Sequence, residues 1–240
     1  EPILASGGVI VPPEGYHAAC LEVCRRHNVI YISDEVVTGF GRLGHWYASE
    51  PVFDITPDII ISAKGLTSGY VPLAAMIISD RLIDEVSQSV EGGAVFSNGF
   101  TYSGHPVACA AALANMDVFE SDGLLENART LGPYMQSQLQ SLADLPIVGD
   151  IRGRGLMGCL ECVVSKESKQ PLDLDYAVGS RIDKYCQQLG LLVRPLINMC
   201  VMSPPLCITT EQIDDMVKIL REGISRTMDD LEREGVGRFS

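Results

Sequence analysis

The chain has 240 residues, of which 46% are hydrophobic and 20% charged, so it is long enough to bury the core of one large domain or of a domain and a half. Its formal net charge of −13 argues against a nucleic-acid or anionic-membrane partner, because phosphate-rich surfaces repel an acidic protein. No apolar run approaches the roughly 20 residues that a membrane-spanning helix needs, so we expect no membrane association.

Helices and short apolar strands alternate through the first half of the chain. Helices are predicted at residues 15–29, 80–90, 105–120 and 122–145. Strands are predicted at residues 29–33, 57–62 and 72–79. Only a loop separates the second strand from the third, so we expect these two to be neighbours. This alternation predicts an α/β sheet that is covered on both faces.

The pattern changes after about residue 145. Short strands are predicted at 147–153 and 156–164, followed by helices at 174–189 and 209–235. A threonine and Glu211 are expected to cap the start of the last helix. This mixture predicts a smaller α+β domain.

The eight cysteines are scattered through apolar stretches, which is typical of reduced, buried thiols in a reducing compartment. No signal segment is visible at the start of the sequence, and we therefore expect a cytoplasmic protein. The segment "GCLECVV" (158–164) contains one C-x-x-C pair, but a zinc site would need a second pair or histidines at ligand spacing. We expect two cysteines in a strand and no metal site.

Asp34 and Lys64 each follow a predicted strand, where open α/β sheets bind their ligands. The strand before Lys64 would deliver its amine to the floor of a site. A carboxylate and an amine at one sheet edge suit pyridoxal phosphate, because the amine condenses with the cofactor aldehyde and the carboxylate keeps the pyridine nitrogen protonated. Read singly, Asp34 is also typical of a loop cap and Lys64 of a solvated loop lysine.

Three segments in order, "SDEVVTGFGRLGHWYASE" (33–50), "PDIIISAKGLTSGYVPLAAMIIS" (57–79) and "FSNGFTYSGHPVACAAALANM" (96–116), resemble class III aminotransferases. These are pyridoxal-phosphate enzymes of the aspartate-aminotransferase-like fold (fold type I), an α/β architecture. The resemblance implies that residues 1–122 are the carboxyl-terminal portion of the large, mixed or parallel-sheet domain that binds the cofactor. Residues 123–240 would be the small α+β domain with its connecting helix.

The resemblance also implies roles for individual residues. Asp34 would pair with the pyridinium nitrogen, Val36 would pack on the ring face, and Lys64 would bind the cofactor as a Schiff base and later shuttle the substrate proton. Thr101 would bind the phosphate of the neighbouring subunit's cofactor, with a backbone contact from Phe100, which implies a homodimer. As an alternative, Thr101 is a helix cap.

Substrate choice depends on an arginine. Many relatives have one where this chain has Val201, whereas Arg194 matches the mobile arginine of the ω-amino acid and amine:pyruvate group. Such a guanidinium can clamp the carboxylate of a keto acid; a surface arginine that caps a strand is the alternative. The resemblance thus implies transfer of an amino group from an ω-amino acid or amine to a keto acid such as pyruvate, through pyridoxamine phosphate (PMP). The same scaffold also serves 4-aminobutyrate and diamine transaminases, aminomutases and racemases.

Members of this family are about twice as long as this chain. Their glycine-rich phosphate loop and ring-stacking aromatic residue would lie upstream of Glu1, so we expect the carboxyl-terminal half of an enzyme. A sheet without its upstream strands would expose apolar edge surface. A fragment that folds and associates without catalysis is therefore a further alternative.

Overall fold

The computed structural model describes residues 1–87 and 98–236. The chain groups into two compact units, which are described here one at a time. The first contains Glu1–Pro2, Pro12–Gly41 and His45–Leu125, and the second contains Ile3–Val11, Arg42–Gly44 and Glu126–Ser240. The domain boundary between residues 122 and 123 stays a prediction, because compact units need not be domains.

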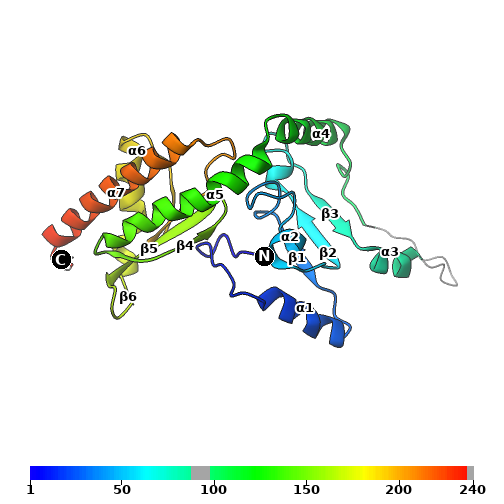
Figure 1. The fold of residues 1–240 in the computed structure, drawn as a ribbon, viewed down its shortest axis with the longest axis horizontal. Helices are drawn as coiled ribbons and strands as arrows, with labels where there is room; N and C mark the ends of the chain where they lie inside the picture. Colours follow the sequence, from blue (N-terminus) through cyan, green and yellow to red (C-terminus); the bar gives the residue numbers. More distant parts are fainter. Residues whose placement is uncertain (88–97, 237–240) are drawn as a thin grey trace. The chain divides into compact units, whose positions relative to one another are not determined.

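The first unit contains a mixed sheet of three short strands (Figure 1). In spatial order they are β1 (Ile32–Asp34), β2 (Ile59–Ser62) and β3 (Ala75–Ile78). β1 and β2 are parallel, whereas β3 is antiparallel to β2, so the predicted pairing of the second and third strands is confirmed. β1 is shorter than its apolar run because the Tyr31 N–H donates to the Asp58 carboxylate (2.8 Å) rather than to a strand.

Three of the helices in the first unit match predictions, namely α1 (Tyr16–Arg26), α3 (Asp80–Ser87) and α4 (Pro106–Ser121). Positions 88–90 of the predicted helix at 80–90 lie outside the described residues. The short helix α2 (Ser49–Phe53) and the 3₁₀ turn η1 (Lys64–Leu66) are too short to produce a helical period in the sequence.

An aromatic cluster fixes the segment that follows β1. The Phe40 and Trp46 ring centroids are 5.7 Å apart, and Trp46 stacks on Phe119 of α4 at 5.4 Å. Phe40 also packs against Gly65, where an added Cβ would lie 2.6 Å from the Phe40 Cβ. The segments that follow β1 and β2 are thus packed together, and residue 65 has no room for a side chain.

The second unit contains an antiparallel sheet. Its order is β4 (Val148–Arg154), β5 (Met157–Ser165), β8 (Met199–Met202) and β7 (Arg194–Leu196), and the short β6 (Gln170–Pro171) also pairs with β5. β4 and β5 match the predicted strands. β8 is an apolar run of four residues that lies close to two prolines. A run this short does not show a strand pattern in the sequence.

The helical segments of the second unit are interrupted where single helices are expected. α5 (Leu124–Gln140) continues into the 3₁₀ helix η2 (Ser141–Asp144), and a second 3₁₀ turn, η3 (Leu174–Tyr176), precedes α6 (Val178–Gln188). Ala177 separates η3 from α6 because its φ of 45° is left-handed.

The last helix, α7 (Thr210–Arg233), begins with a capping box. The Thr209 side chain accepts from the Gln212 N–H (3.3 Å), and the Gln212 side chain accepts from the Thr209 N–H (3.0 Å). The expected cap with Glu211 is therefore wrong by one residue, because Gln212 is the third helical residue after the cap. α7 packs along α6 (Figure 1), and its Leu220 and Ile224 are fully buried.

Among the residues that the structure describes, no helix combines the length and the apolar character that crossing a membrane requires.

Candidate active site

The carboxyl ends of β1 and β2 bring the first candidate residues to one sheet edge. Asp34 ends β1 directly opposite Ile61, and the parallel ladder continues through the Glu35 N–H, which donates to the Ile61 carbonyl (2.8 Å). Lys64 lies three residues beyond Ile61 and two residues beyond Ser62, where β2 ends. Parallel pairing therefore puts the acid and the amine at the same edge of neighbouring strands.

Glu35, the residue next to Asp34, is only 1% exposed and has both carboxylate oxygens occupied. Its Oε1 accepts from the Ser49 N–H (2.8 Å) and hydroxyl (2.6 Å). Its Oε2 accepts from the Ala48 N–H (2.7 Å) and the Thr38 hydroxyl (3.1 Å). With four donors around it, Glu35 holds the segment between β1 and α2 in place and is not available to a ligand.

Asp34, in contrast to Glu35, accepts few hydrogen bonds from the protein. Its side chain is half-buried, and Oδ1 accepts one hydrogen bond, from the Val36 N–H (3.1 Å). Oδ2 has no protein donor within residues 1–87 and 98–236. Of the two consecutive acids, Asp34 is thus the one that can accept a hydrogen bond from a bound group. Val36 is half-buried on the same short segment.

Lys64 is the first residue of η1 and has a left-handed φ of 41°. The N–H groups of Thr67 and Gly69 both donate to its carbonyl, at 3.3 Å. The side chain is exposed, and its amine has no hydrogen-bond or ion-pair partner in the described part of the chain. Lys64 is thus exposed beyond the end of β2, and the expectation that it lies on the floor of a site stays a prediction.

Phe100 and Thr101 lie in an exposed turn before α4. The Phe100 N–H donates to the Ser103 hydroxyl (2.8 Å), and the Ser103 N–H donates to the Phe100 carbonyl (2.9 Å). α4 begins at Pro106 with His105 as its cap residue and without a side-chain cap bond, so the alternative that Thr101 caps this helix is wrong. The Thr101 hydroxyl has no partner among the described residues.

Arg194 belongs to the second unit and is the first residue of β7. It lies directly opposite Val201 in the β7–β8 ladder, so the two candidate arginine positions are cross-strand neighbours on one face of the sheet. Arg194 is exposed, and no carboxylate in the described ranges pairs with it. Arg152, by contrast, forms ion pairs with Asp150 and Glu161 at 2.7 Å.

Arg42 is a half-buried cation that the sequence pattern does not distinguish from a surface residue. It donates to the carbonyls of Leu156 (3.1 Å) and Pro204 (2.5 Å), and burial lowers its pKa to about 10. These bonds give Arg42 a structural role in the second unit, where it holds the loop that contains Pro204.

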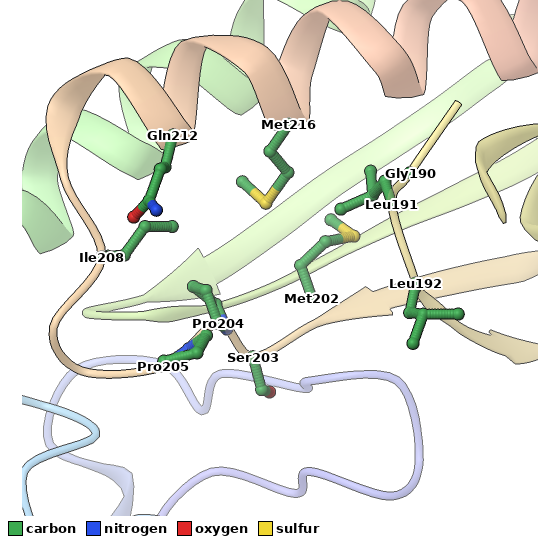
Figure 2. A pocket seen from close by; sticks show the side chains of 10 residues that line it. All are labelled: Gly190, Leu191, Leu192, Met202, Ser203, Pro204, Pro205, Ile208, Gln212 and Met216. Carbon is green, nitrogen blue, oxygen red and sulfur yellow. The ribbon is translucent and has the colours of Figure 1, made fainter. Parts of the chain in front are cut away.

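A pocket of about 430 Å³ lies beside that loop (Figure 2). Its lining comes from residues 190–192 and 202–205 and from Ile208, Gln212 and Met216. Figure 2 shows the two methionine side chains, Met202 and Met216, pointing toward each other across it. No charged side chain is among the lining residues, so this pocket offers no clamp for a carboxylate.

The C-x-x-C pair lies on β5, as expected for cysteines in a strand. Burial raises the pKa of Cys159 to about 11 and that of Cys162 to about 12, so both remain thiols at neutral pH. All eight cysteines are free. The described residues also contain no cluster of side chains suited to a metal ion.

The uncommitted groups at the β1–β2 edge fit the needs of pyridoxal phosphate. That cofactor requires a carboxylate for its ring nitrogen and a primary amine for its aldehyde. Asp34 has a carboxylate oxygen without a donor, and Lys64 has an amine without an acceptor. A structural ion pair would have joined such groups to other side chains, as it does for Asp58, which binds both Arg25 and Arg81.

Comparison with known proteins matches the chain to one family. The family model described as "Aminotransferase class-III" matches residues 1–224. An uncharacterized aminotransferase of Sinorhizobium fredii is 42% identical over 98% of this chain, and the putrescine–pyruvate aminotransferase of Pseudomonas aeruginosa is 38% identical over 95%. The structure of a PMP-bound aminotransferase from Vibrio fluvialis superposes on 96% of the chain with a TM-score of 0.88 and 40% identity. The chain spans 51%, 49% and 51% of these three proteins, respectively, which is about half of each.

Proposed function

Because the chain belongs to the class III aminotransferases, which use pyridoxal phosphate, we propose that the protein moves an amino group from an ω-amino acid or an amine to a keto acid such as pyruvate. The chain spans about half the length of these relatives, so the proposal concerns the activity of the whole protein. The observation that carries it is the pair of uncommitted groups, Asp34 Oδ2 and Lys64 Nζ, at the ends of neighbouring parallel strands.

The residues at this sheet edge would divide the work of cofactor binding. When bound, pyridoxal phosphate supplies an electron-accepting ring that stabilises the charge left when a substrate C–H bond breaks. Asp34 would accept a hydrogen bond from the ring nitrogen, and Val36 would pack on the ring. Lys64 would hold the cofactor aldehyde and then use its Nζ to move the proton between carbon atoms.

Two further roles concern the phosphate and the substrate. The Thr101 hydroxyl and the Phe100 backbone would contact the phosphate of the neighbouring subunit's cofactor in a homodimer. Arg194 would bind the carboxylate of the keto acid through two parallel hydrogen bonds. Its lack of an acidic partner in the described ranges supports this role, since a guanidinium already held by a carboxylate would have to break that pair first.

The first test is cofactor attachment. We expect the purified 240-residue chain to develop a visible absorbance band with pyridoxal phosphate, and borohydride reduction to fix the cofactor on the peptide that contains Lys64. Lys64→Ala should abolish the band and the labelled peptide. Equal labelling of Lys64 and of the exposed Lys218 would contradict the proposed site.

Turnover separates the alternatives. An aminotransferase consumes its amine only when a keto acid is present, whereas an aminomutase or racemase needs no second substrate. Activity with 4-aminobutyrate or a diamine would identify the other transaminases of this scaffold. A folded chain that takes up no cofactor would support the non-catalytic alternative. The cytoplasmic location stays a prediction.

A further inference from the structure

Asn115 of α4 connects this helix to the turn that carries Lys64. Its amide nitrogen donates to the Gly65 carbonyl (2.9 Å) and to the Leu66 carbonyl (3.1 Å). Its amide oxygen accepts from the Ser68 hydroxyl (2.6 Å). Carbonyl oxygens only accept hydrogen bonds, so this orientation of the amide is the one that satisfies all three contacts.

These contacts supply hydrogen bonds that the turn cannot obtain from a neighbouring strand. β2 ends at Ser62, so the carbonyls of Gly65 and Leu66 have no partner strand. Lys64 itself has a left-handed φ, which an L-residue keeps only when its surroundings fix it. Phe40 closes the other side of the turn, where it packs against Gly65. Asn115 supplies the polar contacts of this arrangement, and Phe40 supplies the apolar ones.

We propose that Asn115 is a positioning residue for Lys64: its two donated hydrogen bonds hold η1 in the conformation that places Lys64 at the sheet edge where Asp34 lies. The proposal rests on the proposed function of Lys64. It assigns the effect to the donors, because the carbonyls that they bind follow Lys64 directly, whereas the bond from Ser68 reaches a more distant part of the turn.

Two substitutions separate the donors from the acceptor, and a third serves as a control. Asn115→Asp keeps the shape and the acceptor for Ser68 but replaces the donating nitrogen with an oxygen that faces two carbonyls. Ser68→Ala removes only the third contact. Asn127→Asp is the matched control in the second unit, because the Asn127 amide likewise bridges two carbonyls, those of Leu206 (2.6 Å) and Ile208 (3.0 Å).

Two measurements on each variant test the proposal. Hydrogen exchange of the backbone amides at residues 66–69 reports on the turn, and reductive labelling by pyridoxal phosphate, with Lys218 as the internal reference, reports on the lysine. For Asn115→Asp we expect exchange to be about tenfold faster and Lys64 labelling to fall about tenfold relative to Lys218, since the loss of two hydrogen bonds is of that order. Ser68→Ala and Asn127→Asp should change each quantity less than twofold.

Unchanged exchange in Asn115→Asp would overturn the proposal. Faster exchange with unchanged Lys64 labelling would also overturn it, because Asn115 would then stabilise the turn without positioning the amine. If the unsubstituted chain shows no preference for Lys64 over Lys218, these 240 residues do not attach the cofactor specifically by themselves. In that case, the exchange measurement still decides whether Asn115 holds the turn.

Discussion

Asp34 and Glu35 are consecutive acids with opposite environments. Successive side chains along an extended segment point to opposite faces of a sheet. Here the side chain of Glu35 is buried, whereas that of Asp34 is half-buried. Glu35 enters the packed side, where four donors surround it, and Asp34 keeps an oxygen free. Glu35 thus fixes the segment that carries Asp34, and Asp34 is the acid that can bind a ligand.

Glu35→Gln tests this division. The amide nitrogen would face donors where an oxygen now accepts, so at least one buried donor loses its partner. We expect the free energy of unfolding to fall by about 2–3 kcal/mol. Urea denaturation measures this, with the exposed Glu50→Gln of α2 as a control that should change stability by less than about 0.5 kcal/mol. Equal stability of the two variants would contradict the buried role of Glu35.

At the scale of elements, Asp58 joins three parts of the first unit. Its side chain is 1% exposed and accepts from the Tyr31 N–H before β1, from Arg25 of α1 and from Arg81 of α3. Burial alone would raise its pKa, but these three donors outweigh burial, and the pKa lies below its ordinary value of 3.8. The two arginines are partly exposed, so the network contributes less to the free energy of unfolding than a fully buried one would.

This network predicts a dependence of stability on pH. A carboxyl group with a lowered pKa in the folded state contributes stability above its unfolded pKa, and the contribution is lost as the pH falls through the folded pKa. We expect Asp58→Asn to cost about 2 kcal/mol at pH 7 and progressively less below about pH 4. Denaturation of both proteins at a series of pH values measures the difference. A difference that stays constant down to pH 2 would rule out this linkage.

The elements also show what an apolar pattern can and cannot predict. The strands around Asp34 and Lys64 were predictable because β-branched runs of this kind are rare outside buried sheets. The turn η1 was not predictable, because three residues are too few to show a helical period. The hydrogen bonds that stabilise it come from Asn115, about 50 residues away in the sequence. Partners at that distance leave no local signal.

At the scale of the whole molecule, the family and its α/β fold were predictable because three long motifs occur in order, and the match to residues 1–224 confirms them. The sequence did not decide whether Lys64 is buried or exposed, because burial depends on every element around a site rather than on the flanking sequence. Half-exposed apolar residues such as Ile32 on β1 and Met76 on β3 agree with the apolar edge surface that we expect of this sheet.

The left-handed backbone of Lys64 has a consequence for selection. For any residue except glycine that conformation costs about 1 kcal/mol, so selection for stability alone would favour glycine at position 64. We expect Lys64→Gly to be more stable than Lys64→Ala by about 1 kcal/mol, as measured by thermal or urea denaturation, although both lack the amine. If the alanine variant is equally stable, the turn carries no strain. If the glycine variant is more stable, keeping a lysine there means that this position sacrifices stability for chemistry.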